Sequence, residues 1–150
     1  ITADHTVYTA RNDVYSSFHI PLLIFDPSNT QSKIDPKVGT HVDILPTIID
    51  LLNIPTSHAS MGKSLLDKSK AGFGATTFYP TFLFFNDTSL YVDDFEKRRE
   101  YFPSFKATLP KNEALQNHLI ESDEMQRKLR AYVQSASRAV NQDFIYKKVK

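Results

Sequence analysis

A carboxylate and an imidazole stand side by side near the start of the sequence, at Asp4 and His5. These two side chains are natural ligands for Zn²⁺ or Mn²⁺. Neighbouring residues of a strand point to opposite faces, so both can reach one ion only where a strand runs into a loop. A catalytic metal needs about three protein ligands and an open position, and no HxxxH or HxH pattern supplies the others. Taken alone, the dipeptide is better explained as a capped turn beside a surface histidine.

Two short apolar runs predict the strands that would position this pair. Residues 1–3 have the character of a strand end, and residues 19–25, "HIPLLIF", predict a second strand. The run from Ile20 to Phe25 is nearly continuous in apolar residues, which is typical of a strand covered on both faces. Because ligands collect at the carboxyl ends of strands in open α/β sheets, the position of Asp4 and His5 fits a binding site.

The stretch "HVDILPTIIDLLNIP" predicts a helix after the second strand. Asp43 is its expected N-cap, and Asn53 can take the left-handed position that ends a helix before Pro55. Residues 1–55 therefore have the strand, loop, strand, loop, helix order of an α/β domain. The apolar residues recur at i, i+3, i+4 and i+7 and form one stripe, at Leu45, Ile48, Ile49 and Leu52.

The second half of the sequence has a different pattern. "TTFYPTFLFF" and "SLYVDD" flank a turn cluster at residues 86–88, which predicts an antiparallel hairpin. The mixed charges of "EKRREYFPSF" predict a surface segment. A second helix is expected to begin at Ser122 as its N-cap. Its apolar stripe consists of Met125, Leu129, Tyr132, Val133, Ala136 and Val140.

The amino-acid composition narrows the classes to which the protein can belong. With 150 residues, 41% of them hydrophobic and 23% charged, the chain has the size and make-up of one globular domain. A formal net charge of +1 argues against a nucleic-acid-binding module, which usually has a basic excess. No apolar run is long enough to cross a bilayer. The absence of cysteine excludes disulfides and thiolate metal sites.

Four motifs, taken together, resemble one known family. "ITADH", "HIPLLIFDP", "GTHVDILPTIIDLLNIP" and "MGKSLL" are similar in order and spacing to the C-terminal part of the sulfatase-like phosphotransferases, within the alkaline phosphatase/sulfatase superfamily. This group includes lipoteichoic acid synthases, phosphoglycerol transferases and phosphoethanolamine transferases. The resemblance covers residues 1–66, the expected family core, whereas residues 67–150 agree only in general shape with a hairpin and helix subdomain. The implied fold is α/β: a single domain that forms the C-terminal part of a sulfatase-like α/β sandwich, with a C-terminal antiparallel hairpin and terminal helix.

The resemblance implies that Asp4 and His5 bind the catalytic divalent metal, which is Mn²⁺, Mg²⁺ or Zn²⁺. In the family this metal activates a threonine nucleophile and neutralises the phosphate oxygens. The nucleophile and the other ligands lie upstream in the family, so the chain is expected to be the C-terminal fragment of a larger enzyme and inert alone. Thr6 departs from the family, which commonly has Gly after Asp-His.

His19 stands where phosphoethanolamine transferases often have His-Val-Pro, which makes it a candidate substrate-binding residue by resemblance. A hydrogen-bonded histidine at a strand start explains it better. Three further polar residues also have structural explanations. His41 is expected to make a hydrogen bond near the helix start, Asp43 to cap the helix, and the Thr47 hydroxyl to bond a backbone carbonyl rather than act as a nucleophile. Gly62-Lys63-Ser64 lacks the glycine spacing of a P-loop and predicts a turn.

The function implied by the resemblance is transfer of phosphoglycerol or phosphoethanolamine from a phospholipid to an envelope glycan or lipid. The parent is expected to be membrane-anchored with an extracytoplasmic catalytic domain, and the fragment itself to be soluble. Two alternatives stay open: a non-catalytic partner- or glycan-binding module with a vestigial Asp-His pair, and a sulfuric or phosphoric ester hydrolase of the same superfamily. The expected partners are the missing N-terminal part of the catalytic domain, a phospholipid head group and an envelope acceptor, with no nucleic acid. An exposed sheet edge is also expected to promote self-association.

Overall fold

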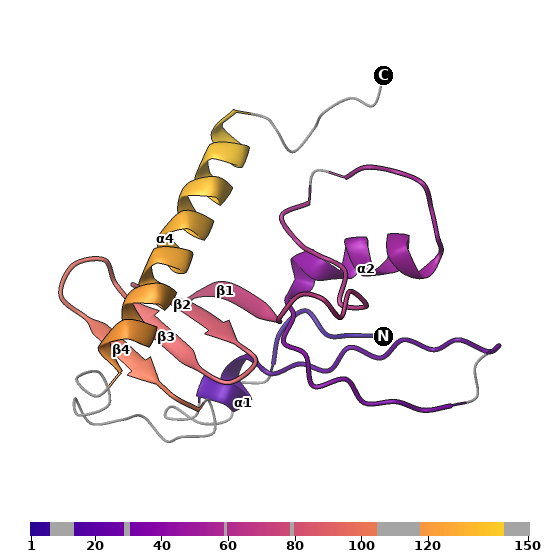
Figure 1. Cartoon of the computed structure of the whole chain (residues 1–150), viewed down its shortest axis with the longest axis horizontal. Coiled ribbons are helices and arrows are strands. Elements are labelled where there is room, and N and C mark those ends of the chain that lie inside the picture. The colour runs from indigo at the N-terminus through magenta and orange to yellow at the C-terminus, as the bar shows by residue number, and fades with distance from the viewer. Residues whose placement is uncertain (7–13, 29–30, 59, 79, 105–117, 143–150) are drawn as a thin grey trace.

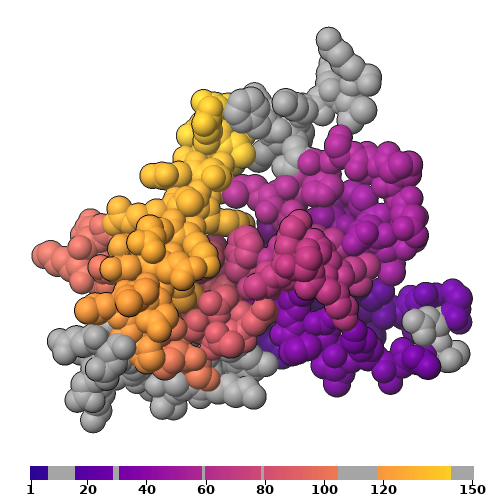
Figure 2. Space-filling model, in the orientation of Figure 1, coloured from indigo at the N-terminus to yellow at the C-terminus, as the bar shows by residue number. Residues whose placement is uncertain are grey.

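The computed structural model describes residues 1–6, 14–28, 31–58, 60–78, 80–104 and 118–142. It combines helices with a four-stranded antiparallel sheet and a long C-terminal helix, so the chain is of mixed α/β type. Apart from residues 14–18, which lie against the sheet, the described N-terminal residues lie on one side of the molecule and the sheet with its long helix lies on the other (Figures 1 and 2). In the described part of the chain, no helix is both long and apolar enough to cross a bilayer.

The sheet is an antiparallel meander in the order β1-β2-β3-β4. The predicted hairpin is confirmed as β2 and β3, and the Asn86 side chain accepts the backbone N–H of Ser89 across the turn, at 2.8 Å. The run "TTFYPTFLFF" is not one strand, because Pro80 has no N–H to donate to a ladder and lies in a turn. The strands are β1 (Phe73–Phe78), β2 (Thr81–Asn86), β3 (Leu90–Asp93) and β4 (Arg99–Phe102).

Strand β4 corrects the expectation that "EKRREYFPSF" is a surface segment. Its first residue, Arg99, is exposed, but Tyr101 and Phe102 are buried on opposite faces of the sheet. Charge dominates the composition of this segment, but its last two strand residues are both buried because apolar clusters cover both faces of the sheet. A strand with a polar start and an apolar end therefore has the composition of a surface loop.

Both faces of the sheet carry apolar clusters. Helix α4 (Leu119–Asn141) covers one face and supplies Met125 and Leu129 to it (Figure 1). On the opposite face, Phe18 of the short helix α1 (Val14–Phe18) packs against the second cluster. Full burial of such side chains contributes about 1.5–3 kcal/mol each. The sheet residues of the first cluster are Phe84, Tyr91 and Tyr101, and those of the second are Leu83, Leu90, Val92 and Phe102.

The C-terminal helix is confirmed, but it begins one turn before the expected N-cap. Ser122 lies inside α4, fully buried, and its hydroxyl has no hydrogen-bond partner among the described residues. The cause is the buried stripe, because Ser122 lies three residues before Met125 and therefore on the same face of the helix. The packing of that face extends the helix through the position that local capping preference would make its start.

A buried polar network joins α4 to the sheet. The Asp93 carboxylate is 1% exposed and accepts hydrogen bonds from the Tyr91 hydroxyl at 2.7 Å and from Gln126 Nε2 on α4 at 2.8 Å. The backbone N–H of Phe95 donates to the other carboxylate oxygen at 2.6 Å. Burial and the hydrogen bond to Asp93 raise the pKa of Tyr91, while Arg99 Nε donates to the same hydroxyl at 2.9 Å. The network is satisfied by its own members and fixes the helix on the sheet.

The N-terminal half differs most from expectation. Residues 1–3 and 19–25 do not form regular strands; they run as extended chain joined by one antiparallel pair, in which Ile1 and Leu23 exchange both backbone hydrogen bonds, at 2.5 and 2.7 Å. The run from Leu22 to Phe25 is exposed rather than covered on both faces. Its apolar character is that of a core strand, but no described element packs over it from both sides.

The predicted helix at 41–55 is confirmed in a shorter form. A 3₁₀ turn, η1 (His41–Asp43), leads into α2 (Ile44–Leu51), and Asn53 takes the left-handed conformation with φ of 51° as expected. The apolar stripe of this helix is mostly exposed, with Leu45 at 54% and Leu52 at 60%. The side of α2 that is buried carries Pro46 and Thr47 instead.

Candidate functional site

Asp4 and His5 lie in a turn at the end of the first extended segment, and both side chains are exposed. One carboxylate oxygen of Asp4, Oδ1, accepts the backbone N–H of His5 at 3.0 Å. The other oxygen, Oδ2, lies 3.7 Å from His5 Nε2. The turn therefore brings the two side chains together on one side of the backbone, as a shared site requires.

The His5 ring is oriented by a backbone carbonyl. Its Nδ1 lies 2.9 Å from the carbonyl oxygen of Thr6, which can only accept, so Nδ1 carries the proton in the neutral ring and Nε2 keeps its lone pair. This hydrogen bond, and secondarily the Asp4 carboxylate, raise the pKa of His5. Metal-ligating histidines commonly bond a backbone carbonyl or carboxylate through the second ring nitrogen in this way. Asp4 Oδ2 and His5 Nε2 are thus the two atoms of the turn whose lone pairs stay available as metal-type donors, and they are called its free donor atoms below.

These two atoms fit part of a metal site. Two donors that each bind one Zn²⁺ or Mn²⁺ at about 2.0–2.2 Å lie about 3–3.5 Å apart, close to the observed 3.7 Å. The mixed carboxylate and imidazole set suits Zn²⁺ and Mn²⁺. Among the described residues, no group of three or more His, Cys, Asp or Glu side chains is arranged to hold a metal. Two such atoms are fewer than the three protein ligands that a catalytic metal needs.

Hydrogen bonds hold the backbone on both sides of the pair. Before it, His41 Nε2 donates to the carbonyl oxygen of Ala3 at 2.8 Å, so the hydrogen bond expected of His41 is present and ties η1 to the site. After it, Thr6 Oγ1 donates to the carbonyl oxygen of Ser17 in α1 at 2.6 Å. This role of Thr6 could not be predicted from the sequence, because its partner is set by the tertiary structure. The residue type, a hydroxyl at the end of a turn, was the only available signal.

Asp43 takes the N-cap position of α2 that the sequence predicts, but its carboxylate makes no capping bond to that helix. Oδ2 instead accepts the backbone N–H of Thr40 at 2.7 Å, as part of a capping box on η1. Oδ1 accepts the backbone N–H of Lys63 at 2.8 Å. The buried carboxylate therefore fixes the 3₁₀ turn and joins it to the "MGKSLL" segment.

Thr47 is likewise structural, as expected. Its hydroxyl donates to the carbonyl oxygen of Asp43 at 2.6 Å and accepts the backbone N–H of Leu65 at 3.0 Å. Gly62 lies where a Cβ would be 1.9 Å from the carbonyl oxygen of Val42, so only glycine allows this close approach. The motifs around residues 43–47 and 61–66 are thus held together by these contacts. Neither the Thr47 hydroxyl nor the Asp43 carboxylate is free for chemistry.

His19, the candidate substrate-binding residue, is exposed at the start of the extended segment 19–25. It belongs to no metal-binding group with Asp4 and His5 in the described part of the chain. Within the described residues, the structure therefore brings Asp4 and His5 together but does not add His19 to them as a third member of such a group.

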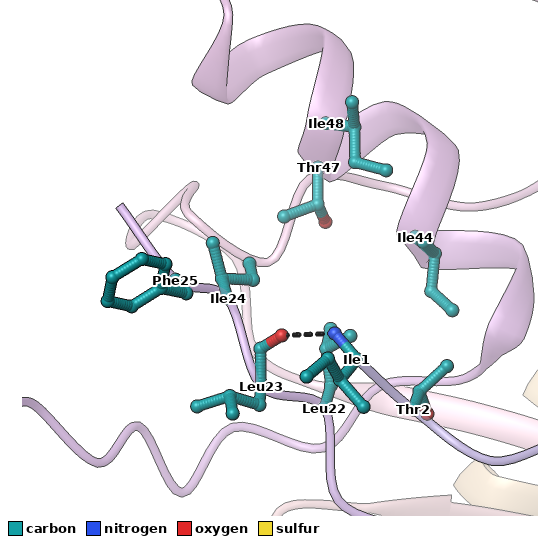
Figure 3. A pocket seen from close by; sticks show the side chains of 9 residues that line it. All are labelled: Ile1, Thr2, Leu22, Leu23, Ile24, Phe25, Ile44, Thr47 and Ile48. Carbon is teal, nitrogen blue, oxygen red and sulfur yellow. Dashed lines mark hydrogen bonds between the residues drawn. The ribbon is translucent and has the colours of Figure 1, made fainter. Parts of the chain in front are cut away.

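An apolar groove lies between α2 and the two extended N-terminal segments, and neither Asp4 nor His5 lines it. It has a volume of about 310 Å³ and is bounded by α2 on one side and by the two extended segments on the other (Figure 3). This volume is at the lower end of the range for small-molecule sites, about 300–1,000 Å³. The groove continues the exposed apolar surface of the N-terminal half. Its lining residues are Ile1, Thr2, Leu22, Leu23, Ile24, Phe25, Ile44, Thr47 and Ile48.

Comparison with known proteins gives no further assignment. No family model, no curated protein and no solved structure matches this chain.

Proposed function

We propose that this chain is the C-terminal part of a metal-dependent enzyme of the sulfatase family. The proposed reaction is transfer of phosphoglycerol or phosphoethanolamine from a phospholipid to an envelope glycan or lipid. The observation that carries the proposal is the Asp4–His5 turn, in which the two free donor atoms face each other at 3.7 Å. The four motifs that resemble the family supply the choice of reaction.

The residues of this chain have defined tasks in the proposal. Asp4 Oδ2 and His5 Nε2 bind the divalent metal, Mn²⁺, Mg²⁺ or Zn²⁺, while the Thr6 carbonyl keeps the His5 ring in the required tautomer. His41 and Thr6 hold the backbone on each side of the pair. When bound, the metal supplies Lewis-acid stabilisation of the charge on the phosphate oxygens. The nucleophile and the missing ligands come from the upstream part of the parent enzyme.

The exposed apolar surface supports the proposal that this chain is one part of a larger enzyme. Phe25 is 81% exposed, and the stripe of α2 is exposed beside it. Contiguous apolar patches of this kind mark surfaces that another part of a protein or a partner covers. In the proposal, the parent is anchored to a membrane with its catalytic domain outside the cytoplasm, where phospholipid head groups and envelope acceptors meet.

A non-catalytic partner-binding module is the second candidate, and the apolar groove is the observation that favours it. It needs no metal at Asp4 and His5, whereas the first proposal does. A phosphatidylglycerol or phosphatidylethanolamine donor assay therefore separates the two.

The assay compares the full-length parent with residues 1–150 alone, each with Mn²⁺. We expect metal-dependent release of diacylglycerol by the parent and none by residues 1–150. Robust turnover by residues 1–150 would contradict the incomplete site, and a parent inactive with both donors would contradict the transferase assignment.

A further inference from the structure

Helix α1 lies where the N-terminal segments meet the sheet (Figure 1), and one hydrogen bond joins it to the turn that carries Asp4 and His5. Thr6 Oγ1 donates to the carbonyl oxygen of Ser17 at 2.6 Å, in partly buried surroundings. Ser17 lies in the last turn of α1, where carbonyl groups have no partner within the helix. The Thr6 hydroxyl therefore satisfies a carbonyl at the helix end, and the helix holds Thr6 in place.

The side chain of Thr6 transmits this contact to its own backbone. Threonine is β-branched and has few χ1 rotamers, so a fixed hydroxyl also fixes the direction of the main chain at the same residue. The carbonyl oxygen of Thr6 is the group that lies 2.9 Å from His5 Nδ1. The bond to Ser17 and the bond to the His5 ring thus meet at one residue, and the direction of the ring depends on the position of α1.

The position of α1 depends in turn on Phe18. The helix has five residues, too few to be stable by itself. The Phe18 ring packs on the second apolar cluster of the sheet and meets the Phe78 ring edge-on, with the two ring centroids 6.2 Å apart. Because Phe18 follows Ser17 directly, its burial places the carbonyl group that receives the Thr6 hydroxyl.

We propose that Thr6 and Phe18 are positioning residues for the Asp4–His5 pair. The Phe18 ring anchors α1 on the sheet, and the Ser17 carbonyl of that helix holds the Thr6 hydroxyl. Thr6 in turn holds the His5 ring with Nδ1 protonated and Nε2 open. The sheet of the C-terminal half thereby supports a metal site whose two ligands lie in the N-terminal half. The inference rests on the proposed function, in which Asp4 and His5 bind the metal.

The tautomer of the His5 ring tests the positioning without any metal. Which ring nitrogen carries the proton is set by the hydrogen bonds of the ring, and the ¹⁵N signals of a neutral histidine distinguish the two forms. We expect the proton mainly on Nδ1 in the wild-type chain at ~pH 8. Thr6→Val keeps the shape of the side chain but removes the hydroxyl, and it should lower the ratio of Nδ1–H to Nε2–H at least about threefold. Thr6→Ser, which keeps the hydroxyl, should retain the wild-type ratio.

Phe18→Ala and Phe85→Ala separate positioning from a general loss of stability. Both phenylalanines are half-buried and pack on the same apolar cluster, but Phe18 belongs to α1 whereas Phe85 belongs to β2. We expect Phe18→Ala to lower the His5 tautomer ratio as Thr6→Val does, and Phe85→Ala to leave it unchanged. Circular dichroism checks that both variants are folded. An unchanged ratio in Thr6→Val or in folded Phe18→Ala, or an equal change in Phe18→Ala and Phe85→Ala, would overturn the proposal.

A Mn²⁺ titration of the Thr6 variants separates this inference from the proposed function. The Mn²⁺ concentration that broadens the His5 signals should rise several-fold in Thr6→Val and stay at the wild-type value in Thr6→Ser, because residues that orient a ligand change the metal affinity of complete sites by about 10–100-fold. If Thr6→Val shifts the tautomer but wild-type His5 does not bind Mn²⁺, the contact from α1 to His5 is supported and the proposed metal site is wrong. If wild-type His5 binds Mn²⁺ and Thr6→Val binds it equally well, the metal site is supported and Thr6 is not a positioning residue.

Discussion

Replacing Asp4 by alanine in the parent enzyme is expected to lower the rate of head-group transfer by at least about 100-fold. The substitution removes Oδ2, one of the two free donor atoms of the turn, while His5 keeps its bond to Thr6. A bound metal contributes several kcal/mol of charge stabilisation to such reactions, and every 1.4 kcal/mol is a factor of ten in rate. The rate of diacylglycerol release at saturating Mn²⁺ measures the effect.

Asp35→Ala is the matched control for this experiment. Asp35 is also an exposed carboxylate, and its nearest ion partner is Lys68 at 4.0 Å, a surface pair worth little energy. We expect its activity to stay within about twofold of the wild type. If Asp4→Ala were as active as Asp35→Ala, Asp4 would not be a ligand of the catalytic metal.

Replacing Asp93 by alanine is expected to lower the free energy of unfolding by about 3–4 kcal/mol. The substitution leaves the Tyr91 hydroxyl, the Phe95 N–H and the Gln126 amide without their buried acceptor. A buried polar group that loses its partner costs about 1–3 kcal/mol. Tyr91 keeps only the hydrogen bond from Arg99. Denaturant unfolding followed by circular dichroism measures the change.

Asp123→Ala is the control within the same network. Asp123 accepts a hydrogen bond from Arg99 Nη2 at 2.7 Å, but it lies at the surface, with 54% of its side chain exposed. Exposed ion pairs of this kind contribute about 0–1 kcal/mol. An Asp93→Ala variant no less stable than Asp123→Ala would show that the buried network does not fix α4 on the sheet.

Local sequence patterns were sufficient to predict the helices and strands that pack against other elements of this chain. The periodicity of residues 125–140 predicts α4, and the turn cluster at 86–88 predicts the β2–β3 hairpin, because each element packs its apolar side on the other. Asn53 was also predictable, since its left-handed conformation depends on its own short side chain. The exact start of α4 was not, because burial of Ser122 outweighs its preference for a cap position.

Local sequence patterns could not predict which apolar segments are covered by other parts of the structure. The run from Leu22 to Phe25 has the composition of a core strand, but composition does not say which chain supplies the covering layer. The candidate site was likewise predictable only in part. The types of Asp4 and His5 were visible in the sequence, whereas the Thr6 carbonyl that orients the ring and the His41 bond to Ala3 depend on backbone geometry and long-range folding.

The most direct test of the central claim is a Mn²⁺ titration of residues 1–150 followed by NMR. Mn²⁺ is paramagnetic and broadens the signals of nuclei near its binding site, so the ring signals of His5 report on the proposed pair. His58, exposed and without an acidic neighbour in sequence, is the internal control. The titration is run at ~pH 8, because the raised pKa of His5 lets protons compete with the metal at lower pH.

If Asp4 and His5 bind the metal as a pair, the His5 signals should broaden at a several-fold lower Mn²⁺ concentration than those of His58. Asp4→Asn, which keeps the size of the side chain but removes its charge, should abolish that difference. Equal broadening of His5 and His58 in the wild-type chain would contradict the account.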